Sequence, residues 1–324
     1  MKAAIYRRLG LASEVLEVVD IATPHPGTGE VRVRLAFSGV NPTDWKSRLL
    51  GPMPSWGEQI PNHDGSGVID EVGEGVDRSR IGERVWVFHA ARARFGGTAA
   101  NYTCLPGEQA VRLPDHISLE LGAGLGIPYI TAHGALFGDG PINGKTILVT
   151  GGAGAVGHAA IEIASFFGAR VISTVSNKEK AELASQAGAS TVLNYRDVDF
   201  HEQLVTAAPE GVDRIIDVAL GANLESSLLV LKPHGTIVGY ASEPVDPVIP
   251  VRTLMVRNAN ISLILVYGFT PSQIASAKQD ITIALNANAI NPLPIHLFQL
   301  NDIARAHEAV ESGIVGKVIV NVGE

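Results

Sequence analysis

The sequence has one cysteine, few aromatic residues and no long apolar run. Cys104 stands alone among 324 residues, which excludes an intramolecular disulfide framework and a zinc site built on several thiolates. Hydrophobic residues make up 46% of the chain, yet no run of about 18 uninterrupted apolar residues occurs, so no membrane helix is predicted. The N-terminus lacks the apolar core of a signal peptide. We therefore expect a soluble, cytoplasmic protein.

Charge and length narrow the class of protein further. The net charge of −8 argues against a nucleic-acid partner, because nucleic-acid surfaces normally need a basic face. Charged residues make up only 18%, which excludes a disordered chain. At roughly 150 residues per domain, the length predicts about two domains.

Two patterns divide the chain. Before residue 120, short strands alternate with turns, and residues 30–37 alternate apolar with charged side chains. From about residue 143, strands alternate with helices, which predicts a parallel, doubly wound sheet. The expected strands are residues 15–19, 30–37, 67–73 and 83–88 in the first part, and residues 145–150, 170–175, 191–193, 212–218, 235–240 and 261–267 in the second. The expected helices are residues 159–167, 178–187, 199–207 and 222–231.

A glycine-rich turn opens the second part. The sequence Val-Thr-Gly-Gly-Ala-Gly-Ala-Val-Gly at 149–157 places Gly152, Gly154 and Gly157 between an expected strand and an expected helix. Glycines let the backbone approach a pyrophosphate, and the helix N-terminus supplies free N–H groups. A tight turn that binds nothing is the alternative, but the alternating strands and helices around it favour dinucleotide binding.

The end of the next strand distinguishes the two nicotinamide dinucleotides. NAD sites usually carry Asp or Glu about 20 residues after the glycines, at the tip of this strand. Here the sequence reads Ser-Thr-Val-Ser-Asn-Lys at 173–178, without an acid. Ser176 and a nearby lysine can instead donate to a 2′-phosphate, so the sequence favours NADPH.

These motifs resemble the medium-chain dehydrogenase/reductase superfamily, and within it the zinc-free, zeta-crystallin-like NADPH:quinone oxidoreductases. The resemblance covers essentially the whole chain. It runs from the opening Met-Lys-Ala-Ala at 1–4 and Ser-Gly-Val-Asn-Pro-Thr-Asp at 38–44 through the glycine-rich turn to Gly-Lys-Val at 316–318. It implies a GroES-like β-rich domain of residues 1–119 and 266–324, with a Rossmann domain of residues 120–265 inserted into it. The helix and strand near residues 303–310 would return to the first domain.

The resemblance also implies roles for individual residues. Ser176, Lys180 and Tyr195 would hold the 2′-phosphate, and Asn41 and Thr131 would lie beside the nicotinamide. The other expected cofactor contacts are Gly152, Gly154, Ala155, Val156, Gly157, Tyr240, Ala241, Ser242, Val266, Tyr267 and Lys317.

Zinc-containing members of the superfamily carry a cysteine where this chain has Asn41. His63 and Asp64 remain at the next ligand position, but residues 126–131 supply no third ligand. Catalytic zinc normally takes three protein ligands, so we expect no metal and interpret His63–Asp64 as a hydrogen-bonded pair at a surface or between domains.

The substrate is less well defined. The resemblance implies hydride transfer to a quinone, and reduction of an enone or alkenal double bond is the alternative.

The expected catalytic residues are Asn41, Lys46 and Thr131. Lys46 or Arg48 would stabilise an oxyanion, unless both are solvated loop cations. Trp45 or Trp56 would stack on a flat substrate or serve as packing, and His133 is a donor or a packed helix residue.

A cofactor-binding protein without turnover is the non-enzyme alternative. The apolar edge 261–266 predicts a homodimer.

Overall fold

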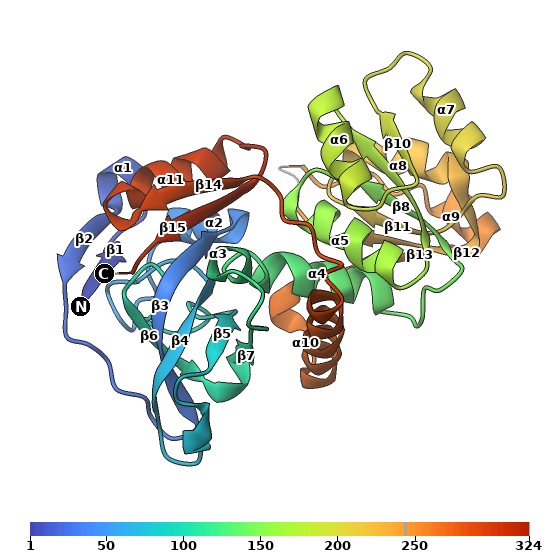
Figure 1. Cartoon of the computed structure of the whole chain (residues 1–324). Helices are drawn as coiled ribbons and strands as arrows, with labels where there is room; N and C mark the ends of the chain where they lie inside the picture. Colours follow the sequence, from blue (N-terminus) through green and yellow to red (C-terminus); the bar gives the residue numbers. More distant parts are fainter. Residues whose placement is uncertain (243–244, 324) are drawn as a thin grey trace. The chain divides into compact units, whose positions relative to one another are not determined.

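The computed structural model describes residues 1–242 and 245–323 and separates them into two compact units (Figure 1). Unit 1 comprises Met1–Ile127 and Pro294–Glu324, and unit 2 comprises Pro128–Leu293. The unit formed from the middle of the chain thus begins at 128 rather than at the expected 120, and it ends at 293 rather than at 265. It extends further because helix α10 (Pro271–Asn286) packs on helix α5 (Ala155–Phe166) of the same unit.

Unit 1 is built on a mainly antiparallel sheet with the strand order β14-β15-β3-β4-β5-β7, and β6 pairs with β3 beside that path. The strands are β3 (Glu30–Val40), β4 (Asp64–Val72), β5 (Arg84–Val87), β6 (Tyr102–Pro106), β7 (Ala110–Arg112), β14 (Ile295–Gln299) and β15 (Lys317–Asn321). β15 pairs antiparallel with β3, so the end of the chain joins the β-rich unit as expected.

The remaining elements of unit 1 surround this sheet. Strands β1 (Lys2–Ile5) and β2 (Glu17–Asp20) form a separate antiparallel pair. The strand expected at 15–19 begins two residues later, because Val15 ends a short helix, α1 (Ala12–Val15). The other helices are α2 (Pro42–Leu50), α3 (Leu119–Gly122) and α11 (Ile303–Glu311). A core of buried aliphatic side chains, including Ile5, Val33 and Val318, joins both ends of the chain.

Unit 2 contains the expected parallel sheet, in the order β10-β9-β8-β11-β12-β13. Its strands are β8 (Thr146–Thr150), β9 (Arg170–Val175), β10 (Thr191–Asn194), β11 (Val212–Asp217), β12 (Leu231–Gly239) and β13 (Asn260–Leu263). Helices α5, α6 (Lys178–Gln186), α7 (Phe200–Ala207) and α8 (Leu220–Val230) connect successive strands. The doubly wound fold class is therefore confirmed.

Several parts of unit 2 differ from the expectation or were not anticipated. β13 stops at Leu263, and Val266–Gly268 form a 3-10 turn, so the strand expected at 261–267 is only half as long. Helix α10 was not among the expected elements. Helix α4 (Gly126–Phe137), which begins in unit 1, and helix α9 (Val251–Arg257) were not expected either. Both lack the clear apolar-polar periodicity that identifies an amphipathic helix.

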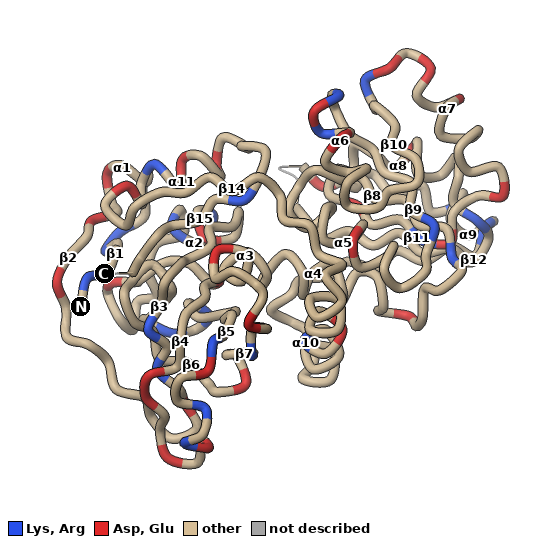
Figure 2. The backbone as a smooth tube through the Cα atoms, viewed as in Figure 1, with Lys and Arg blue, Asp and Glu red and all other residues tan. Residues whose placement is uncertain are grey.

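Charged residues of both signs are interspersed along the chain in each unit (Figure 2). Within residues 1–242 and 245–323, no helix combines the length and the apolar character needed to cross a bilayer.

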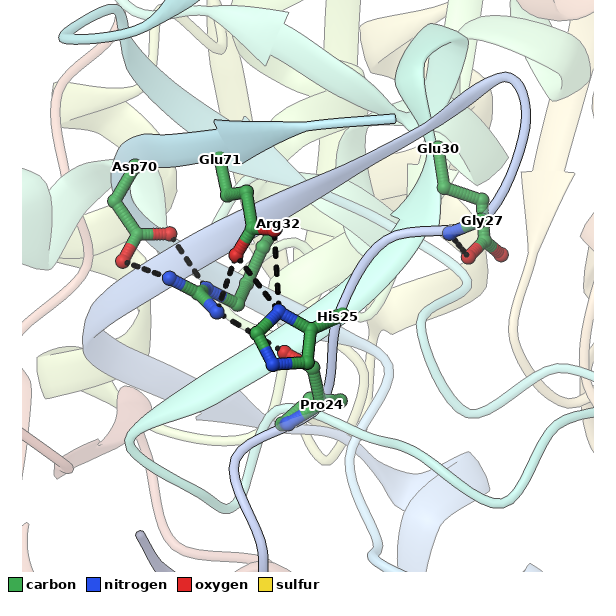
Figure 3. A network of polar contacts seen from close by, with 7 residues as sticks. All are labelled: Pro24, His25, Gly27, Glu30, Arg32, Asp70 and Glu71. Atoms are coloured by element: carbon green, nitrogen blue, oxygen red, sulfur yellow. Dashed lines mark hydrogen bonds and ion pairs between the residues drawn. The ribbon is translucent and has the colours of Figure 1, made fainter. Parts of the chain in front are cut away.

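A polar network in unit 1 holds a loop that contains Pro24 and Pro26 against the sheet (Figure 3). Arg32 on β3 donates to both carboxylate oxygens of Asp70 on β4, at 2.9 and 3.1 Å, and to the Pro24 carbonyl at 3.2 Å. Glu71 pairs with Arg32 and also accepts from His25 at 3.1 Å. The Arg32 side chain is only 15% exposed, and these contacts hold Pro24 and His25 of the loop against strands β3 and β4.

Candidate functional site

The glycine-rich turn of unit 2 joins β8 to the N-terminus of α5. Gly152 has no room for a side chain, since a Cβ there would lie 2.0 Å from the Ser173 hydroxyl oxygen. A Cβ on Gly157 would lie 2.4 Å from the Gly151 carbonyl oxygen. Gly154 precedes the helix and has no side-chain cap, so the first N–H groups of α5 are not capped by a side chain. This is the geometry that an anionic group at a helix N-terminus requires.

Ser176 and Tyr195 follow the carboxyl ends of neighbouring strands. Ser176 comes directly after β9 and is 6% exposed, whereas Tyr195 comes directly after β10 and is 48% exposed. The Tyr195 N–H donates to the Val175 carbonyl at 3.0 Å, which holds the two strand ends together. Lys180 lies in the first turn of α6, where its N–H donates to the side chain of Asn177. Hydroxyl, ammonium and phenol groups thus gather at one edge of the sheet.

Arg196 adds a cation at this edge, which the sequence interpretation did not assign. Its guanidinium carbon lies 6.0 Å from the centre of the Tyr195 ring. The neighbouring sequence Asn194-Tyr195-Arg196, directly after a strand, is the signal that identifies it. The edge therefore carries Lys180 and Arg196 and suits an anionic ligand.

The next strand ends contribute the remaining cofactor candidates of unit 2. Tyr240 follows β12, and its N–H donates to the Asp217 carbonyl at the end of β11 at 3.2 Å. Burial and the Asp217 carboxylate raise the pKa of the Tyr240 phenol, which keeps it protonated. Ala241 and Ser242 are exposed after it, Val266 is buried and Tyr267 is partly buried in the 3-10 turn after β13.

Asp217 is a second residue that the sequence interpretation missed. It is fully buried at the carboxyl end of β11 and accepts from Thr150, the Ala219 N–H and Asn223, at 3.2, 2.8 and 2.9 Å. These contacts link the end of β8, next to the glycine-rich turn, to the start of α8. An acid at the end of a strand followed by a helix was visible in the sequence, but its partners were not.

Helix α4 carries Thr131 and His133, both buried in unit 2. His133 Nε2 lies within hydrogen-bond distance of Asp280 Oδ2 on α10, at 2.8 Å. The His133 ring stacks on Phe137, with ring centres 4.5 Å apart. Burial lowers the pKa of His133 despite this carboxylate. His133 is thus a packed helix residue rather than a free donor.

Asn41 lies in unit 1, in a buried cluster with Asp64 and Lys317. Lys317 Nζ donates to Asn41 Oδ1 at 2.6 Å and to the Val40 carbonyl at 3.3 Å. Asn41 Nδ2 donates in turn to Asp64 Oδ2 at 2.7 Å. Both ends of the Asn41 amide are therefore held, and its orientation is fixed.

Asp44 adds a second carboxylate to this cluster. Its oxygens accept from the Asn41 N–H at 2.6 Å and the His63 N–H at 3.2 Å. Burial and the charge of Asp64 raise the pKa of Asp44 well above its usual range, and burial raises the pKa of Asp64 to about 6 although Lys317 opposes the shift. Burial also lowers the pKa of Lys317. The sequence interpretation did not assign Asp44, whose spacing from Asn41 is that of a helix cap.

This donor set does not suit zinc. The Lys317 ammonium donates to Asn41 Oδ1, so a positive charge already occupies the position next to the side-chain oxygen of Asn41. Among the described residues, no group of three or more His, Cys, Asp or Glu side chains is arranged to hold a metal ion. His63 and Asp64 are both buried, with 6% and 0% exposure, so placing the pair at a surface was wrong.

The two cations after Asn41 have different surroundings. Arg48 is fully buried, pairs with Glu311 on α11 at 3.0 Å and also donates to the Gly10 carbonyl. It is neither a solvated loop cation nor a group free to stabilise an oxyanion, so both interpretations of Arg48 were wrong. Lys46 is exposed on α2, with its ammonium 5.7 Å from the centre of the Trp45 ring. Trp45 and Trp56 are each partly buried.

The predicted residues therefore fall into two groups. Unit 1 brings Asn41 and Lys317 into direct contact, and Lys46 lies on the same helix that Asn41 precedes. Unit 2 places Ser176, Tyr195 and Tyr240 directly after parallel strands, at the end of the sheet where ligands of doubly wound folds bind, whereas Thr131 lies on helix α4.

Comparison with known families matches both units. Residues 27–115 match the alcohol dehydrogenase GroES-like domain, and residues 155–282 match the zinc-binding dehydrogenase family. The chain is 31% identical to the 2-haloacrylate reductase of a Burkholderia species over 95% of its length and 94% of that protein. It is 28% identical to human quinone oxidoreductase, again over 95% of this chain and 94% of that protein.

Solved structures extend the likeness. The chain is 26% identical to an NAD-dependent alcohol dehydrogenase, with a TM-score of 0.88 and full coverage of both chains. It is 25% identical to Escherichia coli quinone oxidoreductase in complex with NADPH, with a TM-score of 0.85 over 99% of this chain and 100% of that chain. With both units matched and the relatives aligned over nearly their whole length, the chain is an oxidoreductase that belongs to the medium-chain dehydrogenase/reductase family of quinone oxidoreductases.

Proposed function

We propose that the protein transfers hydride from NADPH to quinones or related electrophilic carbonyl compounds, without zinc. The observation that carries the proposal is the edge of the unit 2 sheet, where Ser176, Lys180 and Tyr195 follow two neighbouring strands. The strand tip at 173–178 contains no acid to repel a 2′-phosphate. The structure of the Escherichia coli relative in complex with NADPH supports this assignment.

Unit 2 would bind the dinucleotide. The N–H groups at the start of α5, next to Gly154, Ala155 and Val156, would hold the pyrophosphate, since a helix N-terminus favours an anion there. The Ser176 hydroxyl and the Lys180 ammonium would donate to the 2′-phosphate, with the Tyr195 ring beside them. The bound cofactor supplies the hydride. The other contacts proposed on this unit are Gly152, Gly157, Thr131, Tyr240, Ala241, Ser242, Val266 and Tyr267.

Unit 1 would act on the substrate. Lys317 and Asp64 fix the orientation of the Asn41 amide. Asn41 would therefore position the reacting groups without a further loss of side-chain conformational entropy. Lys317 would act through Asn41, because its ammonium donates a hydrogen bond to the Asn41 side chain. Lys46 is the exposed cation that would stabilise negative charge on a reduced oxygen. The Lys317–Asn41 bond also supports a reaction without zinc.

The alternative is reduction of an activated carbon–carbon double bond. The 31% identity to a 2-haloacrylate reductase is the observation that favours it. Such a reaction needs a proton at the α-carbon as well as a hydride, so a donor near Lys46 would matter more than for a quinone.

We also propose a homodimer through the β13 edge of unit 2. β13 lies at the end of the sheet order, and Leu263 and Leu265 are 73% and 65% exposed. On neighbouring α9, Met255 and Val256 are 70% and 77% exposed. A second copy would cover this apolar edge. Light scattering of the wild type and of Leu263→Lys tests this, with loss of the dimer expected in the variant. The cytoplasmic location stays a prediction.

The test of function is NADPH oxidation by the purified, chelator-treated protein. An ortho-quinone and an enone are compared as acceptors, each with NADPH and with NADH. Faster turnover of the quinone with NADPH supports the proposal, whereas turnover of the enone alone selects the double-bond reductase. Binding of NADPH without turnover of either acceptor contradicts both.

A further inference from the structure

Helix α5 contains a buried acid that neither the sequence interpretation nor the proposed function uses. Glu162 is 2% exposed, and α5 is otherwise a run of small and aliphatic residues with His158 one turn earlier. A carboxylate is costly to bury unless hydrogen bonds satisfy it. Its partners therefore show what the position does.

The two oxygens of Glu162 bind two segments that are remote in sequence. The Tyr129 hydroxyl on α4 donates to Oε2 at 2.6 Å, and the Asn291 N–H donates to Oε1. Burial and the Glu162 carboxylate raise the pKa of Tyr129 well above its usual range, so the phenol remains a donor. One side chain thus connects helix α5 to α4 and to the segment that follows α10.

His158 completes the contact with the second segment. Its Nε2 lies 2.8 Å from the Asn291 carbonyl oxygen and 3.4 Å from Glu162 Oε1. Burial lowers the pKa of His158, but the contacts with Glu162 and with Asn291 outweigh it and raise the pKa above its usual value. The N–H and the carbonyl of Asn291 are therefore both held by α5, and the exposed Asn291 side chain is not involved.

The two segments are the places where the chain passes between its compact units. The first passage lies between Ile127 and Pro128, one residue before Tyr129. The second lies between Leu293 and Pro294, two residues after Asn291. Through Tyr129 and Asn291, Glu162 thus holds both connecting segments against α5, the helix that begins at the glycine-rich turn.

We propose that Glu162, assisted by His158, is a positioning residue that fixes both connecting segments to α5. It acts through Tyr129, two residues before Thr131 on α4, and so sets Thr131 relative to the N-terminus of α5. This role rests on the proposed function, in which Thr131 lies beside the nicotinamide and the start of α5 holds the pyrophosphate. Cofactor affinity would then be largely independent of Glu162, whereas hydride transfer would depend on it.

Four variants separate this role from general stability. Glu162→Met keeps the volume and removes both acceptors. Glu162→Gln loses the charge, but its amide oxygen can still accept from Asn291 while its NH₂ donates to the Tyr129 oxygen. Tyr129→Phe removes only the α4 contact, and Asn291→Ala removes a side chain that makes none of these bonds.

Amide hydrogen exchange of the free protein is measured first, because it does not depend on activity. Removal of a buried acceptor should speed local opening by at least about tenfold in peptides covering 129–137 and 287–293 of Glu162→Met. Glu162→Gln should restore most of the protection, Tyr129→Phe should open only 129–137, and Asn291→Ala should match the wild type. Should Glu162→Met fail to fold, Tyr129→Phe decides on the α4 contact alone.

Binding and turnover are measured on the same variants. A misplaced reacting centre should lower kcat by at least about tenfold in Glu162→Met while the Kd for NADPH stays within about threefold. Wild-type exchange in both Glu162→Met and Tyr129→Phe would overturn the proposal, as would parallel losses of kcat and NADPH affinity. A wild-type protein that oxidises no NADPH would refute the proposed function, and the exchange data would still decide on Glu162.

Discussion

Lys317 and Asn41 are 276 residues apart in sequence, yet Lys317 Nζ donates to Asn41 Oδ1 at 2.6 Å inside unit 1. The ammonium thereby connects strand β15, which carries Lys317, to Asn41, the residue that precedes helix α2. Asp44 and Asp64 complete the cluster with two buried carboxylates, so the lysine is the charge that makes their burial tolerable.

Replacing Lys317 with methionine should destabilise unit 1 by about 3 kcal/mol, because removing one partner of a buried ionic cluster leaves the others uncompensated. Urea unfolding followed by tryptophan fluorescence measures this in unit 1, since Trp45, Trp56 and Trp86 all lie there. Lys2→Met is the control: Lys2 is 62% exposed in its ion pair with Asp20, and the loss should stay below about 1 kcal/mol. Equal effects of the two changes would contradict the account of the cluster.

His307 should make unit 1 sensitive to acid. It is fully buried, with Nε2 2.9 Å from Asn62 Oδ1, and burial together with the charge of Arg48 lowers its pKa to about 3. A lowered folded-state pKa means that the unfolded chain binds the proton first, so stability is complete above about pH 6.5 and falls as the pH falls toward 3.

His307→Gln should therefore reduce the dependence of the unfolding free energy on pH by about 1.4 kcal/mol per pH unit between about pH 6 and 4. Urea unfolding at several pH values, read by tryptophan fluorescence, gives this slope. His116→Gln, at an exposed histidine of unit 1, controls for the loss of a histidine within the unit that the tryptophans report. An unchanged slope in His307→Gln would show that the histidine titrates equally in both states.

Arg32→Lys should loosen the loop of residues 23–29 while it keeps the charge. Lysine carries its donors on a single nitrogen, so it cannot reproduce the planar contact in which separate Arg32 nitrogens donate to the two Asp70 oxygens and the Pro24 carbonyl (Figure 3). We expect a loss of roughly 1–2 kcal/mol and faster amide exchange in the loop. Arg34→Lys, two residues along the same strand and exposed, is the matched control and should leave both measurements unchanged.

Lys180→Ala should raise the KM for NADPH by at least about tenfold and leave the KM for NADH unchanged, because only NADPH carries the 2′-phosphate. Lys178→Ala, in the same turn of α6 but exposed, provides the comparison. Steady-state kinetics of the wild type and of both variants, each with NADPH and with NADH, give the KM values. If Lys178→Ala and Lys180→Ala weaken NADPH equally, the effect reflects general charge rather than a specific contact.

The sequence predicted those features that local patterns determine. Alternating apolar residues identified β3, and the order of strands and helices around the glycine-rich turn identified the parallel sheet, since both signals lie within short windows. The close approach of Gly152 to Ser173, and of Gly157 to the Gly151 carbonyl, explains why glycines stand at these two positions. Ser176, Tyr195 and Tyr240 each directly follow a strand of this sheet. Their role at a dinucleotide site stays a prediction.

Long-range partners could not be predicted in this way. Arg48 has the sequence surroundings of a solvated cation, and only the return of α11 places Glu311 beside it, 263 residues away. Glu162 looks like a helix-surface acid until Tyr129 and Asn291 are seen to cover it. Helix α4 has no clear periodicity because it is apolar on most sides, so its pattern did not distinguish it from a loop or a strand.

The most direct test of the central claim is the initial rate of NADPH oxidation with an ortho-quinone, compared with the rate with NADH under the same conditions. The account predicts turnover with the quinone and a kcat/KM for NADPH at least about tenfold above that for NADH, as expected when 2′-phosphate contacts are worth about 1.4 kcal/mol or more. Equal or faster oxidation of NADH would contradict the assignment of Ser176, Lys180 and Tyr195.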